Sequence, residues 1–246
     1  MIKLEIVLTV SQSKRLIAKG VKKHPVVKSA YNNGTIGICR GTTTSYIAEE
    51  FLDFKLEPFI YTTGVTVPKN PHPEIKSSKK EINDIIIHKG EIHMDGETVI
   101  EASKNMSPGD VIIKGANALN YDKRTAGCLV GHPAGGTVGG FWGNLYGKKL
   151  RLVIPVGLEK EIGFDIGEIS DLSMDKNPEH SLMPMRGTIV TEIEAFDILT
   201  GAQAFQISAG GIRGAEGSVR LLICCTNEQI SRVKNIITEI ENETPY

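Results

Sequence analysis

The chain has 246 residues, 40% of them hydrophobic and 23% charged, with a formal net charge of −1 at pH 7. This length and composition suffice for one large domain, or for a larger and a smaller one. The near-zero charge excludes an overall basic field, so direct binding to nucleic acid or acidic lipid is not expected. Since no apolar run approaches the roughly 20 residues that span a bilayer, membrane insertion is excluded too.

Two helices are expected at the start of the chain. Ser11 or Ser13 would cap the first helix, and Gly20 would end it. Pro25 suits the first turn of the second helix, which stops at 33–34.

A short apolar run over 36–39 then predicts a buried strand. It is followed by a glycine- and threonine-rich loop and by helical spacing over 47–52. Further strands are expected at 85–87, 111–113 and 150–156, a loop at 69–80, and either a hairpin or a helix within 91–102. Strands alternating with helices predict a mostly parallel open sheet with helices on both faces.

The region 163–186 is irregular and predicts a domain boundary. After it we expect a strand at 189–193, a helix at 195–200, strands at 204–212 and 218–225, and a final helix after a capping box at Thr226. The predicted fold class is therefore α/β for 1–165, plus a small α+β, ferredoxin-like unit over 186–246 that acts as a lid or in oligomerisation.

The first candidate site is the loop after the strand at 36–39. A helix that starts at a strand end directs free backbone N–H groups and a positive dipole at the loop, which favours an anion. Hydroxyl side chains add donors. The alternative is an ordinary hydroxyl-capped helix start. The candidate residues are Gly41, Thr42, Thr43, Thr44 and Ser45.

The second candidate follows the strand at 111–113, at the same predicted sheet edge. Its amide side chains would hold ligand hydroxyls and its charged groups would make further contacts, and Lys123 is a candidate acid or base. The alternative is an asparagine-rich turn with solvated charges. The residues are Gly115, Asn117, Asn120, Asp122 and Lys123.

The third candidate is a glycine-rich segment at a possible helix start. His132 titrates near neutrality, which makes it a candidate catalytic acid or base, or simply a histidine packed or solvated at a turn. Gly135, Gly136 and Thr137 would let the backbone approach a ligand closely. Neither G-x-G-x-x-G nor G-x-x-x-x-G-K-[ST] is present, so no dinucleotide fingerprint or P-loop is predicted.

The remaining chemistry-bearing residues form no cluster. The histidines are scattered along the sequence, so no metal site is predicted, and no cofactor is expected. The four cysteines form no C-x-x-C pair, and the sequence shows no signal-peptide pattern. Both observations predict a reduced, cytoplasmic setting.

Together the three loops resemble the superfamily of pentose-phosphate isomerases, glucosamine-phosphate deaminases, sugar-phosphate-sensing domains of DeoR-type repressors and coenzyme A transferases. The segment 41–44 looks like the first phosphate-binding loop of that superfamily, and 115–120 looks like the isomerase Gly-Ala-Asp-Glu-Ile-Asp motif. The segment 129–136 is loosely similar to the later Lys-Gly-Gly-Gly-Gly loop. The resemblance covers roughly residues 25 to 158.

Departures from the isomerase pattern decide the functional expectation. Asn117 and Asn120 replace both aspartates, and an amide cannot act as a general base. A coenzyme A transferase requires a glutamate nucleophile, for which Glu161 is the only nearby candidate. We therefore expect a protein that binds a small phosphorylated, sugar-phosphate-like ligand, as a sensor or as an enzyme of unassigned reaction. The alternatives are an isomerase or transferase with rearranged catalytic groups and a non-catalytic interaction protein, and a homo-oligomer remains open.

Overall fold

The computed structural model describes residues 1–57, 59–64, 66, 82–94 and 96–244. Its centre is a mixed six-stranded sheet in the order β10-β8-β5-β2-β3-β4. The four strands β10, β8, β5 and β2 are parallel, whereas β3 and β4 are antiparallel to their neighbours. The bounds are β2 (Thr35–Ile38), β3 (Ile85–His88), β4 (Glu91–His93), β5 (Val111–Ile113), β8 (Arg151–Pro155) and β10 (Thr188–Val190).

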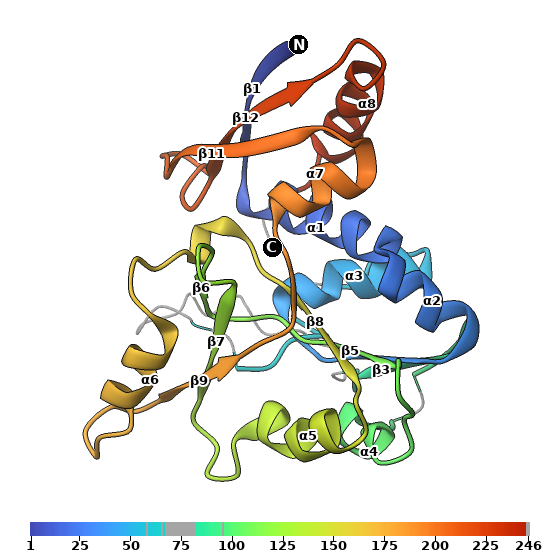
Figure 1. Cartoon of the computed structure of the whole chain (residues 1–246), viewed down its shortest axis with the longest axis vertical. Coiled ribbons are helices and arrows are strands. Elements are labelled where there is room, and N and C mark those ends of the chain that lie inside the picture. Colours follow the sequence, from blue (N-terminus) through green and yellow to red (C-terminus); the bar gives the residue numbers. More distant parts are fainter. Residues whose placement is uncertain (58, 65, 67–81, 95, 245–246) are drawn as a thin grey trace.

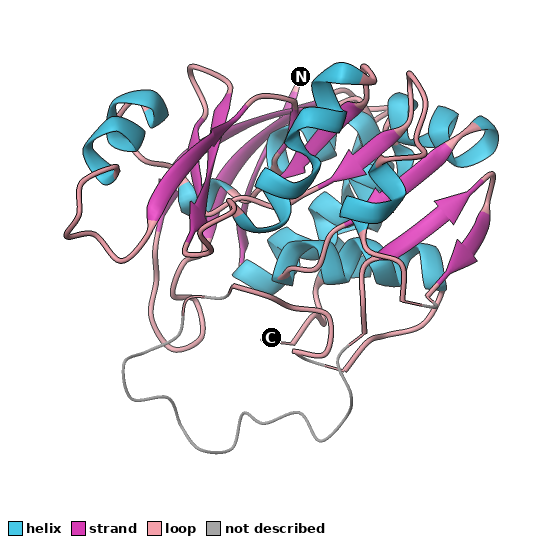
Figure 2. Cartoon of the chain, turned by 90° about the horizontal axis from the view of Figure 1, so that it is seen from below, coloured by secondary structure: helices cyan, strands magenta, loops and turns pink. Residues whose placement is uncertain are grey.

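Helices cover both faces of this sheet, as predicted. Figure 1 shows one group of helices on one face of the sheet and a second group on the other face, and Figure 2 shows the helices over the strands from below. The first group is α1 (Val10–Lys23), α2 (Pro25–Asn33) and α3 (Thr42–Leu52). The second group is α4 (Val99–Ser103) and α5 (Gly136–Gly147). The segment 91–102 thus holds both a strand and a helix start, and the loop predicted at 69–80 falls outside the described residues.

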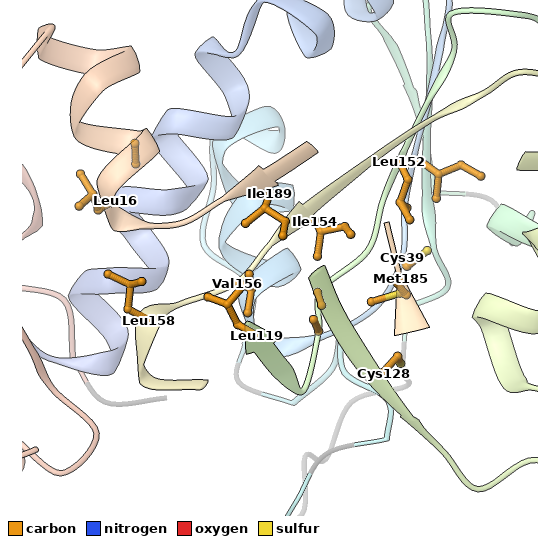
Figure 3. Close-up of a cluster of buried hydrophobic side chains, with 14 of the residues drawn as sticks. Leu16, Cys39, Leu119, Cys128, Leu152, Ile154, Val156, Leu158, Met185 and Ile189 are labelled. Atoms are coloured by element: carbon orange, nitrogen blue, oxygen red, sulfur yellow. The ribbon is translucent and has the colours of Figure 1, made fainter. Parts of the chain in front are cut away.

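Alternation of apolar side chains along the strands creates two cores. Val111 and Ile113 of β5 pack on the face that carries α1 to α3, whereas Ile112 packs on the opposite face. All three side chains are fully buried, which is typical of a parallel strand covered on both sides. Figure 3 shows part of the second core, including Leu152 and Ile154 of β8.

A second sheet packs beside the carboxyl ends of the parallel strands. Its strand order is β6-β7-β9, entirely antiparallel, and Leu119 also forms a bridge to Glu161. The helix α6 packs against this sheet. The bounds are β6 (Ala118–Asn120), β7 (Thr125–Val130), the short 3-10 helix η1 (Leu158–Lys160), α6 (Ile166–Ser173) and β9 (Ser181–Met185).

The third sheet joins the two ends of the chain in the order β1-β12-β11. Val219, Leu221 and Ile223 of this sheet are buried on the side that faces two helices, α7 and α8. The bounds are β1 (Ile2–Leu8), α7 (Glu192–Thr200), β11 (Gln203–Ala209), β12 (Val219–Cys225) and α8 (Ile230–Ile240).

Two expectations about this region need correction. The sequence expectation opened the chain with helices, but β1 precedes them and pairs with β12 through seven registered residues. The strand expected at 189–193 is β10, and it extends the large sheet beside β8 instead of joining the carboxyl-terminal unit. Two strand pairings, β1 with β12 and β10 with β8, therefore link the segment 1–165 to the segment 186–246. The two-domain division and the ferredoxin-like arrangement stay predictions.

Candidate functional site

The four parallel strands end at one edge of the large sheet, which we call the carboxyl edge. The chain leaving β2 turns to α3 on one face, whereas the chain leaving β5 passes through β6 and β7 to α5 on the other face (Figure 1). Adjacent parallel strands whose connections diverge in this way form a topological switch point, which is where open α/β sheets bind ligands. The first two predicted loops, at 41–45 and 115–117, follow these two strands at the switch point.

The first loop forms the start of α3, as predicted. Gly41 is the N-cap residue and makes no side-chain cap bond, while its amide donates to the Tyr61 carbonyl at 3.0 Å. The Thr44 and Ser45 hydroxyls donate back to the carbonyls of Gly41 and Thr42, at 3.1 and 2.7 Å. These two hydroxyls therefore support the helix start, and the donors left for an anion are the first-turn backbone amides.

The Asn117 and Asn120 side chains are engaged in structural hydrogen bonds. The Leu129 amide donates to Asn117 Oδ1 at 3.0 Å, which ties the segment after β5 to β7. Asn120 is buried, donates through Nδ2 to the Phe164 carbonyl at 2.9 Å, and accepts from the Lys123 amide. These contacts agree with the alternative of an asparagine-rich turn.

The charged residues of the second loop lie on the surface. Lys123 Nζ forms a 2.7 Å ion pair with Asp165, and this bond raises the pKa of Lys123. Asp165 at the same time caps α6, because its Oδ1 accepts from the Gly167 amide at 2.7 Å. Asp122 is exposed at the turn between β6 and β7, and Glu161 accepts from the Tyr121 amide at 2.9 Å.

The third loop lies at the end of β7 and leads to α5 on the opposite face from α3. Gly135 and Gly136 begin α5 with φ of 78° and 58°, a conformation that favours glycine, and Thr137 is half-buried. His132 is exposed and accepts the Ala134 amide at Nδ1, 3.1 Å away. An open depression of about 290 Å³ lies beside this loop, lined among others by His132, Ser173, Asp175 and Glu179.

A group of buried and half-buried charged side chains lies at the carboxyl edge and was not predicted from the sequence. We call it the edge cluster. It combines one residue from α1, two from the short helix after β8 and one from the start of α7. Its members are Lys14, Glu159, Lys160 and Glu192.

Hydrogen bonds join the edge cluster to the strand ends. Glu192 is fully buried, and its Oε2 accepts from the Leu158 amide at 3.0 Å. Lys160 Nζ donates to the Ala116 carbonyl, in the segment after β5, at 3.0 Å and lies 4.0 Å from Glu159 Oε1. The edge cluster therefore connects the ends of β10, β8 and β5.

Burial and neighbouring charges perturb the titration of the edge cluster. Burial, followed by the negative charge of Glu159, raises the pKa of Glu192 to about 7, although bonds from backbone amides and the Ser13 hydroxyl oppose this. Burial, followed by the positive charge of Lys160, lowers the pKa of Lys14 to about 8, against the attraction of Glu159. Groups with such perturbed pKa values at a strand edge are typical of functional sites.

Two carboxylate oxygens of the edge cluster have no hydrogen-bond partner among the described residues: Glu159 Oε2 and Glu192 Oε1. Glu159 folds back over Gly157, where a Cβ would lie only 1.8 Å from Oε2. Buried polar atoms almost always have a partner, so these oxygens leave room for a donor from outside the described residues.

Comparisons with known proteins give no assignment. No family model, no curated protein and no solved structure matches the chain. The superfamily resemblance therefore stays a prediction. Within the described part of the chain, no group of three or more His, Cys, Asp or Glu side chains could hold a metal ion. None of the described helices has the length and apolar character that crossing a membrane requires.

Proposed function

We propose that this chain binds a small phosphorylated, sugar-phosphate-like metabolite at the carboxyl edge, as a sensor or as an enzyme. The observation that supports this most strongly is the divergence of the connections after the adjacent parallel strands β2 and β5, because the glycine- and threonine-rich loop opens into α3 at this switch point. The phosphate is the part of the ligand that this edge suits best.

The phosphate would contact the first turn of α3. The amides of Thr42, Thr43 and Thr44 have no intrahelical acceptor, and the helix dipole makes this end positive. Lys114 follows the adjacent strand β5 and is half-buried; its ammonium group, which donates to the Gly115 carbonyl at 3.4 Å, would supply a positive charge to the phosphate. Backbone amides combined with a lysine are a common phosphate-binding arrangement.

The rest of the ligand would extend from β5 toward β8. Lys160, whose ammonium group bonds the Ala116 carbonyl, leads from the second loop to the edge cluster. Ligand hydroxyls would donate to the unpartnered oxygens of Glu159 and Glu192. The edge cluster would thus take the role that the sequence assigned to Asn117 and Asn120.

A thermal-unfolding screen tests this proposal. The probes are ribose 5-phosphate, glucose 6-phosphate and glycerol 3-phosphate, each compared with its unphosphorylated counterpart. A ligand at about 100 times its Kd adds roughly 2.7 kcal/mol of stability. We expect stabilisation by one or more of the phosphorylated compounds only.

The variant Thr42→Glu locates the phosphate. A carboxylate at the first helical position suits the helix dipole, so the fold should tolerate it, but it repels an anion bound at the same amides. Thr42→Gln is the matched uncharged control. Ligand stabilisation should disappear in Thr42→Glu and persist in Thr42→Gln; an undiminished response in Thr42→Glu contradicts the proposal.

A further inference from the structure

The strand β1 presents a free edge. It is an outer strand of the sheet β1-β12-β11, and among the described residues it pairs with β12 alone. This pairing runs from Ile2 to Leu8 without a bulge, whereas the other outer strand, β11, has a bulge between Gln206 and Ser208. A long, regular edge with unpaired backbone groups favours the addition of another strand. We propose that two copies of this chain pair through β1, antiparallel and about a twofold axis at Leu4.

The face of this sheet toward α7 and α8, which we call the inner face, is incompletely covered at β1 (Figure 1). Leu221 and Ile223 of the central strand β12 are fully buried on this face. Their register partners on β1, Ile6 and Leu4, belong to the same core but are only half-buried, as is Ile2. Because β12 has a neighbouring strand on each side and β1 has only β12 in the described chain, a further strand beside β1 would bury these side chains.

The alternation of side chains restricts the register of the pair. A twofold axis that passes through a residue sets inner-face side chains opposite one another, whereas an axis between two residues sets apolar inner-face side chains against the charged outer face. An axis at Leu4 places Ile2 opposite Ile6 of the second copy, and Leu4 opposite Leu4. An axis at Lys3 or at Glu5 also satisfies this rule.

The charges of the outer face select the axis at Leu4. With this axis, Lys3 faces Glu5 of the second copy, and the same ion pair forms a second time by symmetry. The exposed side chains of Met1 and Val7 also face each other. An axis at Lys3 or at Glu5 would instead place that residue opposite its own copy, and like charges directly opposite are destabilising. The edge of β1 is therefore complementary to itself in one register.

Sedimentation velocity of the full chain over a dilution series tests this inference. One strand pair is a small interface, so the dimer should be a weak one. We expect a species of twice the 26.8 kDa monomer mass to appear as the concentration rises to about 200 μM, where a micromolar interface is occupied. A protein that is entirely monomeric at this concentration would overturn the inference.

Charge-reversal variants locate the contact. Lys3→Glu and Glu5→Lys each set like charges opposite one another at two places in the dimer, so the Kd of dimerisation should rise at least about tenfold in either variant. Both side chains are exposed, and Glu5→Lys breaks only an exposed ion pair with Arg220, so the monomer should stay folded. Lys28→Glu makes the same charge change on the exposed surface of α2 and should leave the dimer intact.

Recombining the charges is the most specific test. In a heterodimer of the Lys3→Glu and Glu5→Lys variants, both facing pairs are again opposite in charge, and the same holds for a homodimer of the double variant Lys3→Glu/Glu5→Lys. We expect an equimolar mixture of the single variants, and the double variant alone, to regain dimerisation. Dimers that persist unchanged in both single variants, or that fail to return in these two samples, would show that the copies pair through another surface, and the inference would be wrong.

Discussion

Removing the negative charge of Glu192 should make the protein more stable at alkaline pH. This side chain is fully buried beside Glu159, with Lys14 and Lys160 in the same cluster, and burial raises its pKa to about 7 from an ordinary value of 4.5. Because the folded state prefers the neutral carboxyl group, the wild-type protein loses stability as the pH rises from the unfolded pKa through the folded one. Glu192→Gln removes this titration and keeps a side chain of similar size.

The magnitude follows from the two pKa values. A difference of roughly 2.5 units, at 1.36 kcal/mol per unit, amounts to about 3 kcal/mol. This penalty is absent below pH 4.5 and complete above about pH 7. Relative to wild type, Glu192→Gln should therefore gain about 3 kcal/mol in its free energy of unfolding between pH 4.5 and pH 8.5.

Urea denaturation of both proteins at several pH values measures this difference. Comparing the two proteins at each pH cancels the titration of groups that do not interact with Glu192. A free-energy difference that does not change between pH 4.5 and pH 8.5 would refute the reasoning, because it would mean that Glu192 titrates equally in the folded and unfolded states.

Two further predictions concern the packing around α1. Arg15→Met should lower the free energy of unfolding by about 3 kcal/mol, because it leaves three largely buried carboxylates without their shared partner. Arg220→Met breaks an exposed ion pair and should lower the free energy of unfolding by less than about 1 kcal/mol. Equal losses in the two variants by urea denaturation would contradict this. Gly20→Val should destabilise the folded protein by about 1–3 kcal/mol, since a Cβ at this position would lie 2.8 Å from Ala195 Cα. An unchanged unfolding temperature would contradict this prediction and show that α1 and α7 separate easily.

Local sequence signals predicted the elements that define the carboxyl edge. The apolar run at 36–39 and the glycine that follows it are sufficient to predict a strand, a tight loop and a helix, and the structure confirms all three. The buried strand at 111–113 is confirmed in the same way. Such elements depend on short-range periodicity and turn chemistry, which a single sequence carries.

The first strand was missed although a local signal was present. Ile2, Leu4 and Ile6 alternate with charged residues over most of this segment, which is typical of a half-buried strand. Its partner β12 begins more than 200 residues later, so no neighbouring hairpin supported that interpretation. Likewise, β10 belongs to the large sheet because of its pairing with β8, and that pairing cannot be deduced from 188–190 alone.

The edge cluster could not be predicted from local patterns. Glu192 resembles an ordinary acidic residue in the first turn of a helix, and Lys14 is one of several charged residues on α1. They become unusual only because α1 and α7 pack over the ends of β8 and β10 and exclude water from both side chains. Asn117 and Asn120, in contrast, look like ligand-binding residues in the sequence but make structural hydrogen bonds in the fold. Their partners are distant backbone atoms, so these bonds appear only in the folded chain.

Backbone amide chemical shifts measured during a titration with glycerol 3-phosphate test the central claim most directly. We predict that the largest shifts fall on Thr42, Thr43 and Gly115, which follow the adjacent strands β2 and β5 at the carboxyl edge. Saturable shifts confined to other parts of the molecule, such as the depression beside His132, would contradict a phosphate site at the carboxyl edge.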